Sequence, residues 1–208
     1  MFGRSIALAC LAGVTLLSLS VRADAAGDPE KGELKFYTCY GCHGLPNYRN
    51  AYPDYSVPML RHQTAEYIVS ALKEYRSGER PHPTMHAQAA SLSDQDIADI
   101  AAYLQSSGTK PTKTVSGKTP EQVATCVSCH GDNGTGLEVP MDPRPPVLAG
   151  QHEDYLEQAL IQYRNGRRKN PVMNGMAKAL KSEDDVKIAA HYFAEQESPL
   201  TTASTNSK

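Results

Sequence analysis

The hydrophobic residues of this chain follow helical spacing in two stretches that match each other. In both stretches they recur every three or four positions, which predicts a helix with one buried face. The first set is Tyr67, Ile68, Ala71, Leu72 and Tyr75, and the second set is Tyr155, Leu156, Ala159, Leu160 and Tyr163. Nowhere does the chain alternate for long enough to predict a sheet, so the pattern indicates an all-α protein.

Capping residues predict two further helices in each half. In the later helix a serine is followed three residues on by an acid, which resembles a capping box. These pairs are Ser93 with Asp96 and Ser182 with Asp185. In the earlier helix a capping residue precedes proline at the first helical position. These sites are Asp28-Pro29 and Thr119-Pro120.

The two halves match over their whole length at a nearly constant offset of about 88 residues. The matched pairs include Pro58 with Pro146, Gln63 with Gln151, Tyr75 with Tyr163, Pro83 with Pro171 and Met85 with Met173. Such collinearity indicates that a whole folding unit was duplicated. We therefore expect a first domain at 26–106, a linker rich in Ser, Thr and Pro at 107–118, a second domain at 119–198 and a flexible polar tail at 199–208.

The first 25 residues read as a secretory signal peptide. Arg4 precedes a short apolar run, and Ala23-Asp24-Ala25 has the form of a cleavage site. We therefore expect a periplasmic protein. An uncleaved membrane anchor is the alternative, which the shortness of the run disfavours, and a peripheral association with the membrane stays open. The net charge of −2 argues against a nucleic-acid partner, because phosphate binding requires an excess of Lys and Arg.

Each half contains one C-x-x-C-H motif, namely Cys39-Tyr40-Gly41-Cys42-His43 and Cys126-Val127-Ser128-Cys129-His130. This spacing is the attachment signature of c-type haem, with the two thiols bound to the porphyrin and the histidine on the iron. A zinc site or a redox-active dithiol is the alternative. Two motifs in register use every cysteine except Cys10 in the signal peptide, and this favours two covalently attached haem c groups.

The motif places His43 and His130 on one face of each iron. On the other face we expect Met85 and Met173, which coincide between the halves and follow a proline-containing turn. The other methionines lack a counterpart, so we expect Met59 and Met141 in the core and Met176 in the haem pocket or core. His82 or His86, beside Met85, would instead make the first haem a bis-histidine centre. Iron with both faces ligated exchanges single electrons, so we expect an electron carrier and no enzyme.

With these motifs the chain resembles the diheme cytochrome c4 family, in which two class I cytochrome c domains stand in tandem. Pro146-Val147-Leu148-Ala149-Gly150-Gln151 and Pro83-Thr84-Met85 look like that family's signatures. The resemblance implies that the carbonyls of Pro58 and Pro146 accept the proximal histidine N–H and that the haem edges face each other. It also implies a set of residues near the propionates, namely Tyr75, Arg76, Arg80, Tyr163, Arg164 and Arg168.

One segment departs from the family pattern, the tyrosine-rich stretch 45–55, which stands where the second half has the glycine-rich stretch 131–136. Its three tyrosines would cover the haem edge or dock a partner, and we favour covering.

The expected function is a periplasmic carrier of single electrons from a quinol-oxidising complex or a dehydrogenase to a terminal oxidase or reductase. The alternative is a tightly held diheme subunit of a periplasmic dehydrogenase, such as a flavocytochrome sulfide dehydrogenase. A diheme peroxidase is disfavoured, since the paired methionines would leave neither iron open.

Overall fold

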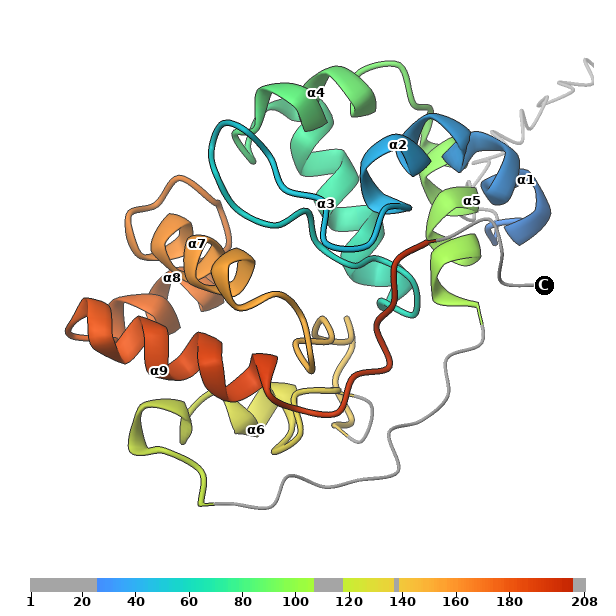
Figure 1. Ribbon diagram of the computed structural model, residues 1–208. Coiled ribbons are helices and arrows are strands. Elements are labelled where there is room, and N and C mark those ends of the chain that lie inside the picture. The colour runs from blue at the N-terminus through green and yellow to red at the C-terminus, as the bar shows by residue number, and fades with distance from the viewer. Residues whose placement is uncertain (1–25, 107–117, 137–138, 204–208) are drawn as a thin grey trace, which may run out of the picture.

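The helices predicted in both halves are present in the computed structural model, which describes residues 26–106, 118–136 and 139–203 (Figure 1). The first half contains α1 (Pro29–Lys35), η1 (Phe36–Cys39), α2 (Tyr40–His43), α3 (Ala65–Ser77), α4 (Pro83–Ala89) and α5 (Asp94–Gln105). The second contains η2 (Glu121–Val123), α6 (Val127–His130), α7 (Glu153–Arg164), α8 (Pro171–Ala179) and α9 (Glu183–Ala194). Within the described residues the only β structure is two isolated bridges, which confirms the all-α class.

The two halves use the same helices in the same order. Helix α3 packs against α5, and α7 packs against α9. Both capping boxes are formed, because Ser93 and Ser182 each accept the N–H of the acid three residues on. The predicted signal peptide and the predicted linker, except for Lys118, lie outside the described residues. None of the helices in the described ranges is long and apolar enough to cross a membrane.

The earliest helix differs between the halves. Asp28 caps α1 as predicted, but the second half has only the 3-10 turn η2 after Pro120. Ten positions separate Pro29 from the first haem-motif cysteine, and only six separate Pro120 from its counterpart. The difference is close to one α-helical turn of about 3.6 residues. The α-helix predicted from Thr119-Pro120 is therefore wrong, since the second half lacks the residues to form it.

The turns predicted before the two matched methionines are helices, α4 and α8. Each has proline at its first position. The residue before the proline is the cap: the His82 ring accepts the Met85 N–H at 3.3 Å, and the Asn170 side chain accepts the Met173 N–H at 3.0 Å. Each methionine is thereby held in the first turn of a capped helix, where its backbone position is well defined.

The predicted flexible tail is wrong for residues 199–203, which form a strap from α9 back to the first domain (Figure 1). Leu200 is buried in a cluster with Val147 and Ala149. Thr201 forms a β-bridge with Arg61, and the buried Ala203 donates its N–H to the carbonyl of His43 at 3.1 Å. Apolar burial and backbone pairing offset the entropy lost by ordering the strap. Residues 204–208 lie outside the described ranges.

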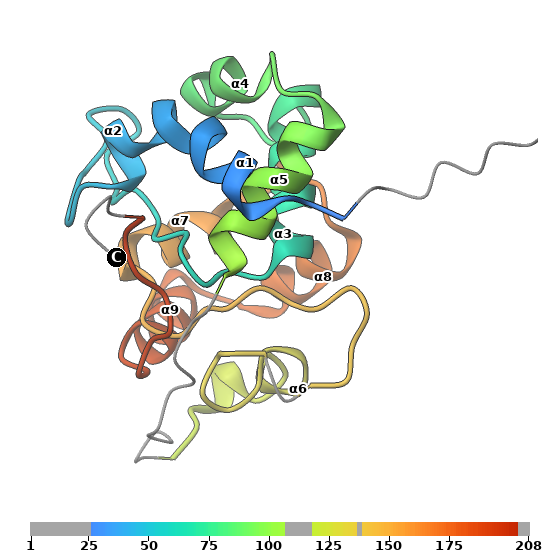
Figure 2. The same ribbon diagram turned by 90° about the vertical axis from the view of Figure 1, so that its right-hand side faces the viewer.

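The two domains lie against each other, with α7 and α8 beside the first domain (Figures 1 and 2). A carboxylate ties them together on one side, because Asp154 accepts hydrogen bonds from Ser56 N–H at 2.9 Å, Ser56 Oγ at 3.0 Å and Arg49 at 2.7 Å. Burial alone would raise the pKa of Asp154, but these hydrogen bonds from Ser56 and the charge of Arg49 bring it below its usual value. The contact therefore holds at neutral pH.

Helix α1 crosses α5 so closely that only glycine fits at the contact. A Cβ built on Gly32 would lie 2.0 Å from the carbonyl oxygen of Asp99, a backbone atom that cannot move alone. A Cβ built on Gly175, in α8, would instead point into open space.

We predict that Gly32→Ala lowers the free energy of unfolding by about 1–3 kcal/mol, because an inserted methyl must separate two packed helices. The matched control, Gly175→Ala, should leave stability unchanged or raise it by about 0.5–1 kcal/mol, since alanine favours the helix. Urea denaturation of the holoprotein measures both. Equal stability of the two variants would contradict this account of the α1 to α5 contact.

We also predict that Leu200→Ala destabilises the protein by about 2–5 kcal/mol, the range for truncating a buried leucine. The control is Leu34→Ala, because Leu34 is 79% exposed on α1. The midpoint of thermal unfolding reports the difference. A midpoint as high in Leu200→Ala as in Leu34→Ala would show that the strap contributes nothing.

Candidate haem-binding sites

An apolar cavity lies beside the C-x-x-C-H motif in each domain. The first has a volume of about 1160 Å³, including space open to solvent, and is bordered by α3, α4, α5 and the haem motif. The second measures about 820 Å³ on the same basis. Most of the surface that lines both cavities is apolar, as it is in cofactor sites.

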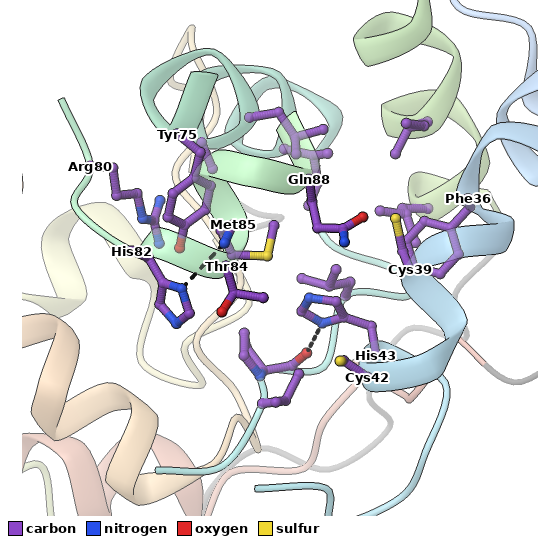
Figure 3. A pocket seen from close by; sticks show the side chains of 18 of the residues that line it. Phe36, Cys39, Cys42, His43, Tyr75, Arg80, His82, Thr84, Met85 and Gln88 are labelled. Carbon is purple, nitrogen blue, oxygen red and sulfur yellow. Dashed lines mark hydrogen bonds between the residues drawn. The ribbon is translucent and has the colours of Figure 1, made fainter. Parts of the chain in front are cut away.

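A buried histidine faces the first cavity from the motif side. His43 is 8% exposed, and its Nδ1 lies 3.0 Å from the carbonyl oxygen of Pro58 (Figure 3). Since a carbonyl only accepts, Nδ1 carries the proton and Nε2 is left as the basic nitrogen. Burial lowers the pKa of His43, so the ring is neutral, as a metal ligand must be.

A methionine faces the same cavity from the other side. Met85 points inward from the first turn of α4, opposite His43, with Thr84 and Gln88 beside it (Figure 3). His82 also borders the cavity, but its Nδ1 is engaged in capping α4. His86 Nδ1 lies 2.8 Å from the carbonyl of Tyr75 in an exposed position. Sequence reasoning missed the capping role of His82, although its alignment with the strong cap-former Asn170 was a usable signal.

The second cavity repeats this arrangement. His130 is 6% exposed, and its Nδ1 lies 3.1 Å from the carbonyl oxygen of Pro146. Burial lowers the pKa of His130 as it does for His43. Met173 borders the cavity from α8. The carbonyl acceptors implied by the family resemblance are therefore in place on both sides of the duplication.

The four motif cysteines are half-buried, and within the described residues none of them is in a disulfide. Cys39 and Cys42 border the first cavity and Cys126 borders the second, while Cys129 is the residue next to His130. Over the described ranges, no three His, Cys, Asp or Glu side chains converge in a way that could hold a metal ion. Cysteines at the edge of an apolar cavity suit the attachment of a porphyrin.

Two expectations about the unmatched methionines are wrong. Met176 and Met141 are 42% and 45% exposed, so neither lies in a core or a haem pocket. Gln88, the counterpart of Met176, does border the first cavity. Met59 is partly buried against the cluster of Val147 and Leu200, as a packing residue at the domain boundary.

A buried arginine with unused donors marks the place for an anion between the domains. Arg80 is 2% exposed, and its Nη2 donates to the hydroxyls of Tyr67 at 2.9 Å and Tyr155 at 3.1 Å. Among the residues that the structure describes, its Nε and Nη1 are buried without a hydrogen-bond partner, and the carboxylate of Glu74 lies 3.9 Å from Nη1. Buried donors of a cation are costly unless paired, and haem propionates would supply the missing acceptors.

Arg168 adds a second buried positive charge to the same region. It is also 2% exposed, and its Nε donates to Gln162 at 2.7 Å. Burial raises the pKa of Tyr155, yet the charges of Arg168 and Arg80 bring it below its ordinary value. Two cations so close together require negative charge nearby. The residues present therefore fit a porphyrin that carries carboxylates.

The other arginines implied to lie near the propionates do not face the cavities. Arg76 donates to the carbonyl of Leu92 at 2.8 Å and pairs with Asp94, and Arg164 donates to the carbonyl of Ser182 at 3.1 Å. Arg76 ties the end of α3 to the start of α5, and Arg164 ties the end of α7 to the start of α9. These two residues are structural, and the resemblance placed them wrongly.

The tyrosine-rich segment 45–55 divides between the two expected roles. Tyr55 is 4% exposed, borders the first cavity and packs in the core cluster of the second domain. Tyr48 and Tyr52 are 40% and 93% exposed. Of the three tyrosines, only Tyr55 therefore covers a cavity.

His62 stands where the second half has Gly150. Its φ of +67° is close to the +61° of Gly150, so His62 adopts the left-handed conformation that glycine adopts in the second half.

The chain matches the cytochrome c family over residues 29–108 and again over residues 116–195. These two matches cover most of its length, so it is a tandem pair of cytochrome c domains that carries two covalently attached haem c groups. Such a protein transfers electrons, and the expectation of an electron carrier rather than an enzyme is confirmed.

Comparison with individual proteins narrows the class. Cytochrome c4 of Pseudomonas aeruginosa is 31% identical over 84% of this chain and 92% of its own length. The thiosulfate dehydrogenase electron acceptor of Stutzerimonas stutzeri is 32% identical over 88% and 93%. The structure of reduced cytochrome c4 from Pseudomonas stutzeri superposes with a TM-score of 0.62 at 28% identity, covering 82% of this chain and all of that one. The chain belongs to the diheme cytochrome c4 family.

Proposed function

We propose that His43 and Met85 ligate the first haem iron, that His130 and Met173 ligate the second, and that the protein passes single electrons between periplasmic redox proteins. The observation that carries this proposal is the pairing of one buried imidazole with one methionine across each cavity. Cys39 and Cys42 would hold the first porphyrin by thioether bonds, and Cys126 and Cys129 the second.

The ligand set suits electron transfer. Thioether sulfur is soft and neutral, so it favours ferrous iron and raises the reduction potential relative to a second histidine. The chain contributes the fixed geometry: capped helices hold the methionines, and proline carbonyls orient the histidines. With both axial positions filled, a bound haem gains and loses an electron with little rearrangement.

The two cavities adjoin, which supports transfer from one haem to the other within the chain. Tyr155 of the second domain borders the first cavity, and Tyr67 of the first domain borders the second. The hydroxyls of these tyrosines are 3.4 Å apart, beside Arg80. An electron received by either domain therefore has a short route to the other.

The donor that the comparisons favour is a dehydrogenase of the periplasm, because one relative is named as the electron acceptor of thiosulfate dehydrogenase. A quinol-oxidising complex is the other donor class, and a terminal oxidase or reductase would be the acceptor. Such encounters are brief and need only a small contact. Arg168, within the basic run 167–169, is buried and cannot serve as a docking charge.

We predict that Met85→Ala and Met173→Ala each remove about half of the weak red-edge absorption band that methionine-to-iron charge transfer gives the oxidised protein. The control is Met176→Ala, which alters an exposed methionine on the same helix as Met173 and should leave the band intact. Visible spectra of the oxidised holoproteins make the comparison. Loss of the band in Met176→Ala and its survival in Met173→Ala would reverse the assignment.

We predict that the holoprotein accepts two electrons per chain from a thiosulfate dehydrogenase and that its ferrous form does not bind carbon monoxide, because no axial position is open. Stopped-flow absorbance follows both reactions. Rapid carbon monoxide binding or peroxide turnover would contradict the carrier function.

Gel filtration of native extract distinguishes a free carrier from a subunit of an enzyme. Elution as a small species supports a free carrier, and elution in a persistent large complex supports the subunit alternative.

A further inference from the structure

Two glutamines reach across the domain boundary and bind one residue each in the opposite domain. Gln63 donates from Nε2 to the carbonyl of Val147 at 3.0 Å and accepts the Val147 N–H at Oε1 at 2.8 Å. Gln151 donates to the carbonyl of Met59 at 2.9 Å and accepts the Met59 N–H at 3.0 Å. Both glutamines are 3% exposed. Gln63 and Gln151 are 88 residues apart, as are Met59 and Val147, so the duplication relates the two contacts to each other.

The orientation of each amide is well defined. Each Oε1 also accepts the N–H of the residue that follows its own glutamine, Thr64 at 2.9 Å or His152 at 3.1 Å. An amide rotated by half a turn would place its NH₂ group against these N–H donors. The acceptor end of each glutamine therefore faces the backbone N–H across the boundary.

The peptide group that each glutamine contacts is the one that holds the proximal histidine of the other domain. The peptide between Pro58 and Met59 offers its N–H to Gln151 and its carbonyl to His43 Nδ1. The peptide between Pro146 and Val147 offers its N–H to Gln63 and its carbonyl to His130 Nδ1. One planar, conjugated group thus links a side chain of one domain to a haem ligand of the other.

Hydrogen bonds at the two ends of a peptide group strengthen each other. An acceptor on the N–H draws its proton and leaves the carbonyl oxygen more negative, which strengthens the hydrogen bond from the histidine. A histidine whose Nδ1–H is bound more strongly is a more basic ligand. A more basic ligand stabilises ferric iron and so lowers the reduction potential.

We propose that Gln151 is a positioning residue that lowers the reduction potential of the first haem, and that Gln63 does the same for the second. This inference rests on the proposed ligation by His43 and His130. It makes docking of the domains part of each haem's electronic environment: contact lowers both potentials, and separation raises both. Because the arrangement is reciprocal, neither domain has its full properties without the other.

The decisive variant is Gln151→Leu, because Gln151 borders the second cavity while its proposed effect is on the first haem. We expect an upward shift in the reduction potential of the first haem that exceeds the shift of the second. Gln63→Leu should raise mainly the potential of the second haem. The matched control is Gln196→Leu, since Gln196 is buried in the second domain and donates to Tyr192 without touching either peptide.

The measurement is a redox titration of the holoprotein followed by NMR, in which the two haems give separate resonances. A second readout is the Nδ1–H proton signal of His43, which should move toward the position of a weaker hydrogen bond in Gln151→Leu and remain in place in Gln196→Leu. If Gln151→Leu does not fold, Gln151→Met keeps the length of the side chain without its hydrogen bonds and should give the same shift.

Three results would overturn the inference: no shift, equal shifts of both haems, or a shift in Gln151→Leu confined to the second haem. Each would leave the proposed function intact, provided that the red-edge band shows methionine on both irons. Absence of that band from the unmodified protein would instead overturn the proposed ligation itself.

Discussion

The burial of each haem within a unit of roughly 80 residues is the constraint on which the rest of the structure depends. A unit of this size buries only enough apolar surface to be marginally stable by itself, and its helices surround a cavity that must be filled. Core residues such as Ile68, Ile100 and Leu104 of the first domain border that space or pack beside it. The porphyrin therefore completes the core as well as providing the chemistry. Both folding and electron transfer require the bound haem.

The same constraint explains why the two domains form one body. Each cavity is bordered in part by residues of the other domain, with Tyr155 at the first cavity and Tyr67 at the second. The carboxylates that a haem brings would meet Arg80 and Arg168 in this buried region. Around it the glutamine pair, the Asp154 contact and the C-terminal strap hold the domains in one relative position. Rigid placement suits electron transfer, which depends on a constant separation of the two centres.

Much of the site could be predicted because the duplication allows each residue of one half to be compared with its counterpart in the other half. Met85 and Met173 stood out because they coincide between the halves and follow a proline-containing turn. Both border the cavities, whereas the unpaired Met141 and Met176 are exposed. The same reasoning was wrong where the copies diverge. Thr119-Pro120 predicted a helix that the second half is too short to form. The polar composition of the tail 199–208 as a whole hid the two apolar side chains that are buried, Leu200 and Ala203.

The sequence by itself determined the cofactor, its number and the helices that surround it, because these depend on neighbouring residues: a five-residue motif, a capping pair, an apolar face repeating every turn. Only the tertiary structure decided which arginines are buried, which tyrosine covers a cavity, and that Gln63 and Gln151 reach backbone groups 84 and 92 residues away. Such contacts depend on how two folded domains dock. Docking is set by the combined shape of many side chains, and no local pattern encodes it.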